Sequence, residues 1–390
     1  MIVGLFRERT PGERRVALIP PEVAALSDSL GAGFLVEAGA GSGAGVPDAA
    51  WEAAGARVVA GPEEVAANAS WHLRVGPPDL STEGEVHLPR SGATLLCLTT
   101  PPGPGALARA VSRTGGGLLA LDRIPRSTRA QSMDVLSSQA TVAGYRGALL
   151  GALHLPRFLP MLTTAAGTIR PARVLVLGAG VAGLQAMATA RRLGAAVTGH
   201  DIRPAALEQI RSLGASTLQD SDPPPGAPEV EGGYARQLEG DEASAQEALL
   251  ARRIGEFDMV VTTAQIPGRP APRLVTTAMV ESMPAGGVVV DLAAATGGNC
   301  QVSRPDHEVV HSGITVLAPT NPASGLPEHA SAMFSRNVAA LLRHLESTGR
   351  DPGDSDDEIL RAITLVHEGR ILDPELEESC TDAPPEGENP

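Results

Sequence analysis

Arg173-Val-Leu-Val-Leu-Gly178-Ala-Gly180-Val-Ala-Gly183-Leu-Gln-Ala186 is the stretch of the sequence that is most informative about the fold. An apolar run enters three glycines at G-x-G-x-x-G spacing, and an alanine-rich helical run follows. In this pattern the first glycine permits a tight turn, the second lets the backbone approach a pyrophosphate, and the third lets helix and strand pack closely. The start of the helix offers N–H groups to phosphates. The pattern predicts a dinucleotide site that includes Gly178, Gly180, Val181, Ala182 and Gly183.

The next predicted strand, 196–200, leads to Asp201, about 20 residues downstream of the glycines, where this type of site carries an acid. Such an acid accepts hydrogen bonds from the ribose hydroxyls of NAD and repels the 2′-phosphate of NADP. Arg203 follows closely, and an arginine there can instead accommodate a 2′-phosphate. The sequence favours NAD(H), with Asp201, Ile202 and Arg203 among the cofactor-binding residues. A glycine-rich turn followed by an ordinary strand-end aspartate is the simpler alternative.

Short apolar runs alternate with alanine-rich helical stretches along the chain, which predicts parallel sheets flanked by helices. Long helical stretches at 129–155 and 328–345 flank the second α/β series. We therefore expect an α/β protein with two Rossmann-like domains, the NAD-binding domain being inserted into the first and joined to it by the long helices. The expected boundaries are 1–138 with 319–372 for the first domain, 139–318 for the NAD-binding domain, and 373–390 for an acidic, disordered tail. Strands are expected at 2–6, 33–37, 57–59, 71–75, 94–98, 117–121, 174–177, 196–200, 259–262, 287–291 and 313–317.

Composition excludes several classes of function. All 31 basic residues are arginine, which rules out lysine Schiff-base chemistry and the lysine of a P-loop ATPase. The formal net charge is −14 and no basic stripe is visible, so nucleic acid is not an expected partner. Three widely spaced cysteines argue against a disulfide framework and favour a reducing compartment. The sequence shows no signal-peptide pattern and no apolar run of about 18 residues, which favours a cytoplasmic protein.

Further motifs connect the chain to a known family. The most specific is Pro125-Arg126-Ser-Thr-Arg-Ala-Gln131-Ser-Met-Asp134-Val-Leu-Ser137. Together with the glycine loop, these motifs resemble the NAD(H)-binding domain I, or alpha subunit, of the proton-translocating nicotinamide nucleotide transhydrogenases, which are relatives of alanine dehydrogenase. The resemblance covers about residues 1 to 370. The other matching stretches are 7–8, 13–18, Gly232-Gly-Tyr234-Ala, Thr262-Thr-Ala-Gln-Ile-Pro-Gly268, Val290-Asp291-Leu-Ala-Ala and Gly297-Gly-Asn299-Cys300.

This resemblance implies an enzyme that transfers hydride between its own NAD(H) and NADP(H) bound on a partner subunit. A separate membrane subunit would couple the transfer to proton translocation. The resemblance also implies a homodimer, in the cytoplasm or peripheral to the membrane. Direct transfer between two cofactors needs placement of the two rings rather than a general acid or base. No metal is expected.

The resemblance also implies roles for single residues. Arg126 would hold the nicotinamide carboxamide, Gln131 would bridge to the facing NADP(H), and Asp134 and Ser137 would orient the ring. Tyr234 would lie on a mobile loop that closes over the nucleotide. The simpler alternatives are a solvent-facing polar segment and a tyrosine that packs on its own domain. Thr263, Ala264 and Asn299 are further cofactor-binding candidates.

A second hypothesis is a stand-alone NAD-dependent oxidoreductase, related to alanine dehydrogenase but with an altered substrate, for example a biosynthetic enzyme. In alanine dehydrogenases the resemblance places a substrate lysine at Arg74 and a catalytic histidine in 95–101, a stretch without histidine here. Ala295 also replaces an acid of the family. Because amine oxidation needs a base, these replacements argue against alanine as the substrate. Arg15 matches a carboxylate-binding arginine, although a structural role is the simpler interpretation.

Two further possibilities receive little support. His307-Glu308-Val-Val-His311 matches the H-E-x-x-H zinc-protease signature. That chemistry requires a helix, and the flanking Pro305 and Gly313 leave room for one turn at most, so we interpret the match as coincidence. A nucleotide-binding regulatory protein without turnover is a third hypothesis, which the joint presence of Arg126, Gln131 and Asp134 disfavours.

Overall fold

A computed structural model describes residues 1–81, 87–100, 103–219, 241–266, 269–348, 353, 356–374 and 376–377, and the side chains of 241–243 are not described. The chain divides into two compact units. Unit 1 comprises 1–139 and 326–390, and unit 2 comprises 140–325. The chain enters unit 2 within helix α5 (Val135–His154) and returns just before helix α10 (Pro327–Thr348). The loop expected around Tyr234 and the tail beyond residue 377 lie outside the described residues.

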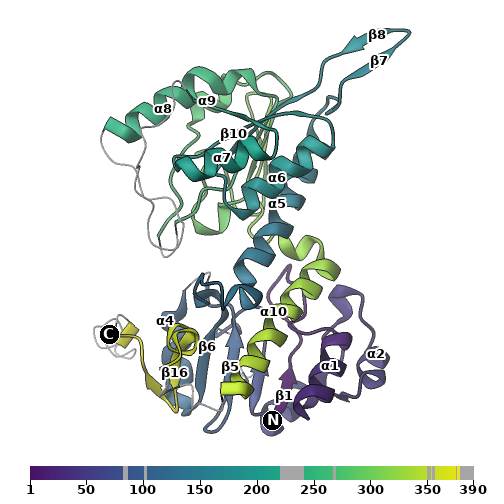
Figure 1. Cartoon of the computed structure of the whole chain (residues 1–390), viewed down its shortest axis with the longest axis vertical. Helices are drawn as coiled ribbons and strands as arrows, with labels where there is room; N and C mark the ends of the chain where they lie inside the picture. The colour runs from purple at the N-terminus through teal and green to yellow at the C-terminus, as the bar shows by residue number, and fades with distance from the viewer. Residues whose placement is uncertain are drawn as a thin grey trace, which may run out of the picture. The chain divides into compact units, whose positions relative to one another are not determined.

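Unit 1 is built on an eight-stranded sheet of order β17-β16-β6-β5-β4-β1-β2-β3 (Figure 1). The strands from β1 to β6 pair in parallel, and β16 joins β6 antiparallel. The chain builds outward from β1 in one direction and then in the other, so the order reverses between β1 and β4, as in a doubly wound fold. The strands are β1 (Ile2–Leu5), β2 (Gly33–Glu37), β3 (Arg57–Val59), β4 (Trp71–Leu73), β5 (Thr94–Cys97), β6 (Gly117–Ala120), β16 (Thr364–His367) and β17 (Arg370–Ile371).

Alternate residues of these strands bury against helices on the two faces of the sheet, as the period-two geometry of a strand requires. One core contains Leu5, Leu73, Leu96 and Leu119 with the apolar side of α10 and with α1, α2 and α11. The opposite face packs on α3 and α4. These helices are α1 (Pro20–Leu30), α2 (Asp48–Ala53), α3 (Pro62–Asn68), α4 (Pro104–Thr114) and α11 (Glu358–Ile363).

Unit 2 contains a seven-stranded sheet of order β11-β10-β9-β12-β13-β15-β14. All its pairs are parallel except that of β14 with β15. The order reverses between β9 and β12, which is where doubly wound sheets bind ligands, beyond the carboxyl ends of the strands. The strands are β9 (Arg173–Leu177), β10 (Ala196–His200), β11 (Ser216–Thr217), β12 (Met259–Thr262), β13 (Val288–Asp291), β14 (Glu308–His311) and β15 (Ile314–Leu317).

The sheet of unit 2 is also covered on both faces (Figure 1). Val174, Val176 and Val261 face α5, α6 and α7, whereas Leu175 and Val260 face α8 and α9. The expected α/β class with two Rossmann-like sheets is thereby confirmed. The remaining helices are α6 (Val181–Arg192), α7 (Pro204–Ser212), α8 (Asp241–Arg253) and α9 (Thr277–Glu281).

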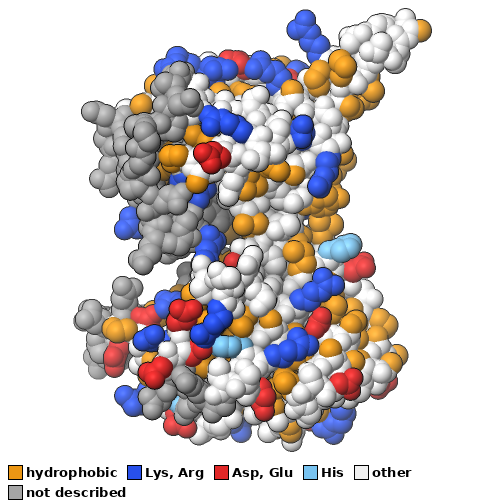
Figure 2. Space-filling view, viewed as in Figure 1, with side chains coloured by type: hydrophobic (Ala, Val, Ile, Leu, Met, Phe, Trp, Pro, Cys, Tyr) orange, Lys and Arg blue, Asp and Glu red, His pale blue; other side chains and the backbone are white. Residues whose placement is uncertain are grey.

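A two-stranded hairpin, β7 (Leu162–Thr164) with β8 (Gly167–Ile169), extends away from the rest of unit 2 (Figure 1). Hydrophobic side chains gather at its root (Figure 2), where Phe158, Met161 and Ile169 are 55%, 63% and 46% exposed. On the same view, arginine and acidic side chains are intermixed over the surface of unit 1.

Three local features differ from the sequence expectations. The helix expected to begin at 129 is instead a short 3-10 turn, Gln131–Met133, followed by α5 from Val135. The histidine motif 307–311 forms β14, so its residues lie on an edge strand and not on a helix, and the coincidental interpretation is confirmed. The hairpin β7–β8 and the strands β16 and β17 were not anticipated.

Candidate functional site

The glycine loop joins β9 to α6 with the geometry that its spacing predicts. Gly178 has φ of 97°, a left-handed conformation that favours glycine. A Cβ atom on Gly183 would lie 1.8 Å from the carbonyl oxygen of Gly178, so a side chain at this position would force the helix away from the turn. Two of the three glycines are therefore needed for the turn and for the close approach of helix to strand.

Gly180 differs from the other two glycines because its backbone conformation is ordinary. It has φ of −76° and ψ of −172°, and a Cβ atom placed on it would meet nothing within 4 Å among the described residues. No side chain caps the helix that starts at Val181. Open space beside the first-turn N–H groups of α6 fits a pyrophosphate, which the N–H groups and the helix dipole would stabilise.

Asp201 lies directly beside this loop. Its Oδ2 accepts a hydrogen bond from the N–H of Ala179 at 2.8 Å. Its Oδ1 accepts from the N–H and Nε of Arg203, both at 2.9 Å, and Oδ2 accepts from Nη2 of Arg203 at 2.8 Å. Burial acts to raise the pKa of Asp201, but the hydrogen bonds and charge of Arg203, with the Ala179 N–H, outweigh it and lower the pKa. Asp201 is therefore ionised at neutral pH and tied to Arg203.

His200, the neighbour of Asp201, is buried and has partners at both ring nitrogens. Nδ1 lies 3.0 Å from the carbonyl oxygen of Leu218, and Nε2 lies 3.1 Å from the side-chain nitrogen of Gln246. Burial lowers the pKa of His200, so the ring is neutral. A neutral ring that donates to Leu218 and accepts from Gln246 is a structural residue, in line with its interpretation as a packed strand-end histidine.

The other side of the loop is formed by the end of β12. The hydroxyl of Thr263 donates to the carbonyl oxygen of Gly178 at 3.1 Å, which ties β12 to the glycine turn. Asn299 is fully buried, and its amide donates to the carbonyl oxygens of Ala264 and Pro272, both at 2.8 Å, while its Oδ1 accepts from the Ala264 N–H at 3.0 Å. Thr263, Ala264 and Asn299 thus stand at the switch point with Gly178. The side chain of Asn299 positions the backbone of Ala264.

Asp291, at the end of β13, is a residue whose function the sequence reasoning missed. It is fully buried, and its carboxylate accepts from the Thr262 hydroxyl, the N–H groups of Ala293 and Cys300, and the Ser303 hydroxyl at 2.7–3.1 Å. Through these four bonds it holds the 293–303 segment, which carries Asn299. Its place at a strand end next to a glycine pair was the available signal.

The Arg126–Ser137 segment belongs to unit 1. Arg126 and Gln131 are exposed, and Asp134 and Ser137 are half-buried. Asp134 precedes α5 and accepts from the N–H of Ser137 at 2.9 Å and from its hydroxyl at 2.6 Å. This is the arrangement of a helix N-cap. The structure thus brings Asp134 and Ser137 together and gives Asp134 a role in starting the helix.

The residues that match the alanine dehydrogenase site are engaged within unit 1. The guanidinium of Arg15 pairs with the Glu13 carboxylate at 2.6 and 2.8 Å and donates to Gln139 at 2.8 Å. Arg74 is buried, and its guanidinium lies 4.3 Å from the ring centre of Phe6. These contacts favour a structural role for Arg15.

Glu8 lies near Arg74, just beyond the end of β1. The residue is half-buried, but its carboxylate turns inward and accepts from the Val75 N–H at 2.5 Å. Burial of the carboxylate raises the pKa of Glu8 from 4.5 to about 7, although Arg74 and the Val75 N–H act to lower it. The folded protein therefore holds this proton more tightly than the unfolded chain, and stability falls as the pH rises from about 4.5 to about 7.

Replacing this carboxylate should stabilise the protein at alkaline pH. Glu8→Gln keeps an oxygen for the Val75 N–H and removes the buried charge. We expect a free energy of unfolding above that of the parent by on the order of 2 kcal/mol at pH 8, and nearly equal values at pH 4.5. Urea denaturation at the two pH values measures the difference. A Glu8→Gln protein less stable than the parent at pH 8 would contradict the assignment.

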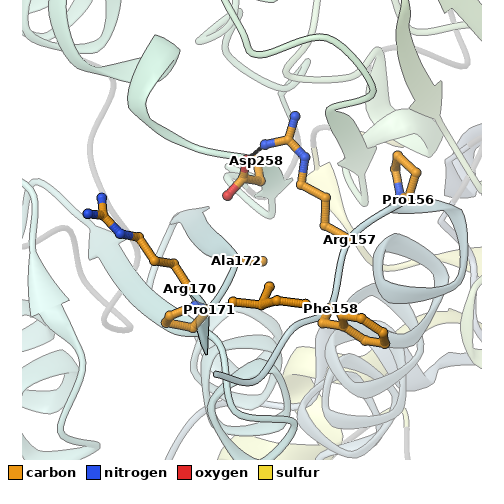
Figure 3. Close-up of a pocket in the computed structure, with 8 residues that line it drawn as sticks. Pro156, Arg157, Phe158, Arg170, Pro171, Ala172 and Asp258 are labelled. Atoms are coloured by element: carbon orange, nitrogen blue, oxygen red, sulfur yellow. Dashed lines mark hydrogen bonds and ion pairs between the residues drawn. The ribbon is translucent and has the colours of Figure 1, made fainter. Parts of the chain in front are cut away.

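A pocket of about 340 Å³ lies elsewhere in unit 2, at the root of the hairpin (Figure 3). Arg157 points toward Asp258 and forms an ion pair with it, while Arg170 extends from the other wall. Ala172 precedes β9 and Asp258 precedes β12, so the pocket lies at the amino ends of these strands. The glycine loop lies at their carboxyl ends. The pocket is therefore separate from the candidate nucleotide site.

Metal ligation and membrane insertion find no support in the described part of the chain. No group of three or more His, Cys, Asp or Glu side chains within the described ranges could hold a metal ion. No helix among those residues is long and apolar enough to cross a membrane.

Comparisons with known proteins agree along the whole chain. Residues 4–143 match the family model of the alanine dehydrogenase/PNT N-terminal domain, and residues 147–374 match that of its C-terminal domain. An NAD(P) transhydrogenase subunit alpha protein of Rhodospirillum rubrum is 40% identical, with 96% of this chain and 99% of that protein covered. The alanine dehydrogenase of Mycobacterium tuberculosis is 30% identical, with 95% of each covered. The solved transhydrogenase from Sinorhizobium meliloti is 41% identical, with a TM-score of 0.83, covering 95% of this chain and 100% of that one.

Proposed function

The chain belongs to the alanine dehydrogenase/PNT family, and from this premise we propose that it is the NAD(H)-binding subunit of a transhydrogenase. The observation that carries the proposal is the open space at Gly180 beside the uncapped start of α6, in a chain that is 40% identical to a transhydrogenase subunit alpha. NAD(H) would supply the hydride chemistry. The protein would bind the nucleotide, orient its ring and exclude competing reactions.

In this proposal unit 2 holds the adenosine and pyrophosphate parts of NAD(H). The N–H groups of Val181, Ala182 and Gly183 would donate to the pyrophosphate, and Asp201 would accept from the ribose. Thr263 and Ala264 would line the site at the end of β12, with Asn299 fixing the backbone of Ala264. Ile202 and Tyr234 would contact the nucleotide as well.

The segment from Arg126 to Ser137 would act on the nicotinamide end. Arg126 would bind the carboxamide, Asp134 and Ser137 would orient the ring, and Gln131 would reach the NADP(H) of the partner. The mutual hydrogen bonds of Asp134 and Ser137 support this proposal, because two coupled side chains at a helix start are held in fixed positions. Transfer itself would require no general acid or base from this chain.

We further propose partners of three kinds. An NADP(H)-binding subunit would receive or donate the hydride, and a membrane subunit would couple the transfer to proton translocation. A second copy of this chain would form a homodimer. The protein would work in the cytoplasm or at the membrane surface.

The stand-alone alternative receives less support from the geometry. An amino-acid dehydrogenase needs a cation for the substrate carboxylate and a base for the amine proton. Arg15 is paired with Glu13, and the stretch matching the catalytic histidine offers the fully buried Cys97, whose pKa burial raises. An inert thiol is a poor base at neutral pH.

Titration with the two nucleotides tests the proposal. NADH should bind the purified chain more tightly than NADPH, and the chain alone should neither reduce NAD⁺ with L-alanine nor oxidise NADH with pyruvate and ammonium. Equal affinity for both nucleotides would contradict the NAD(H) assignment. Turnover with alanine would move the assignment to the dehydrogenase branch of the family.

A further inference from the structure

The carboxylate of Asp201 has no unused acceptor position. A carboxylate offers about four lone-pair sites. The Ala179 N–H takes one, and the backbone N–H, Nε and Nη2 of Arg203 take the other three. The side chains of Asp201 and Arg203 are only 5% and 15% exposed, so the pair is largely withdrawn from water.

This arrangement changes the usual account of nucleotide selectivity. A lone acid would repel the 2′-phosphate of NADP(H), but an acid paired with arginine carries little net charge. A ribose hydroxyl is a donor and can replace one donor of Arg203 on Asp201. A 2′-phosphate offers only acceptors, so it could bind Arg203 only by pulling the guanidinium off Asp201 and leaving a buried carboxylate without its cation, which is costly.

We infer that Arg203 is a 2′-phosphate ligand masked by Asp201, and that this pairing, rather than the charge of Asp201 alone, sets the preference for NAD(H). The inference rests on the nucleotide site proposed above. It implies that removing the charge of Asp201 uncovers an NADP(H) site, since an unpaired arginine at this position binds a 2′-phosphate.

Asp201→Asn tests the masking directly. The asparagine oxygen still accepts from the Ala179 N–H, so the loop keeps its bond, but the amide no longer holds the guanidinium. NADPH should bind this variant at least about 10-fold more tightly than the parent, and NADH should bind about 10-fold more weakly, the scale of one charge-assisted hydrogen bond. Adding Arg203→Ala to the variant should abolish the gain for NADPH. A gain that persists without Arg203, or no gain at all, would overturn the inference.

Arg203→Ala alone gives a second test that does not depend on Asp201→Asn folding. A masked arginine contributes nothing to NADPH in the parent, so NADPH affinity should stay within about two-fold; a large loss would show that Arg203 already serves the phosphate. Glu208→Gln, an exposed change of equal charge on α7, controls for net charge. NADH binding by the parent keeps the two claims apart: its absence would refute the proposed function, whereas its presence without the switch would refute only the masking.

Discussion

Gly183→Ala should abolish tight binding of NADH, raising the dissociation constant at least about 100-fold, or about 2.7 kcal/mol. A Cβ atom at this position would lie 1.8 Å from the Gly178 carbonyl oxygen, which is backbone and cannot rotate away. The start of α6 must then shift, and its N–H groups lose their alignment with the pyrophosphate. Alanine normally favours a helix over glycine, so any loss of stability here reports the clash. We expect the melting temperature to fall by roughly 5 °C, as overpacking of this kind costs about 1–3 kcal/mol.

Gly180→Ala is the matched control for this prediction. Its Cβ atom meets nothing within 4 Å and its backbone conformation suits any residue, so the melting temperature should stay within about 1 °C of the parent. The added methyl group would still occupy space proposed for the pyrophosphate, and NADH should bind at least about 10-fold more weakly. A Gly180→Ala protein that binds NADH as tightly as the parent would remove the pyrophosphate from this loop.

Gln131→Asn should slow hydride exchange with an NADP(H)-loaded partner at least about 10-fold, or about 1.4 kcal/mol in the barrier. The proposed role of Gln131 is to bridge toward the second nucleotide, and shortening its reach by one methylene disturbs the distance between the rings. Among the described residues its exposed side chain has no hydrogen-bond partner, so the change should leave stability unaltered. NADH affinity should remain within about two-fold of the parent.

Stopped-flow exchange and NADH titration separate the two possible roles of this residue. Gln209→Asn, the same change at an exposed position on α7, should affect neither quantity. If Gln131→Asn weakened NADH binding while the exchange rate per bound NADH stayed unchanged, Gln131 would be a ligand of NAD(H) and not a bridge.

The sequence predicted the regular parts of the fold because their apolar patterns are strong. The strands at 33–37 and 57–59 and the helix Pro20–Leu30 lie where the alternation and the initial proline place them. The glycine spacing likewise predicted the turn at Gly178 and the tight packing at Gly183. In these stretches the local preference and the tertiary contacts favour the same conformation.

Elements without a buried face escaped prediction. The hairpin β7–β8 is almost entirely exposed, so neither strand shows the alternation that marks a half-buried strand. The helix expected from 129 starts later because the Asp134 side chain caps Val135–His154, a tertiary choice among several polar residues that could have capped it. The strand at 308–311 needed β15 as its antiparallel partner.

Partner choice within the candidate site was also beyond the sequence. Asp201 and Arg203 were both expected near the ribose, but only their geometry reveals that three donors of one residue occupy the carboxylate of the other. The commitment of Asn299 to the backbone of Ala264 and Pro272, and the four bonds of Asp291, likewise depend on loops that meet only in the folded unit. Motif spacing places such residues at one sheet edge without specifying their hydrogen bonds.

Transfer of deuterium from NADH carrying deuterium at the nicotinamide C4 position tests the central claim most directly. The chain would be mixed in ordinary water with the NADP(H)-binding subunit of a transhydrogenase that is loaded with NADP⁺, and the NADPH formed would be examined by mass spectrometry. We predict that the NADPH carries deuterium, that its formation requires both proteins, and that no hydrogen from water enters the transferred position. NADPH without deuterium, or no NADPH although NADH binds and the two proteins associate, would contradict the account.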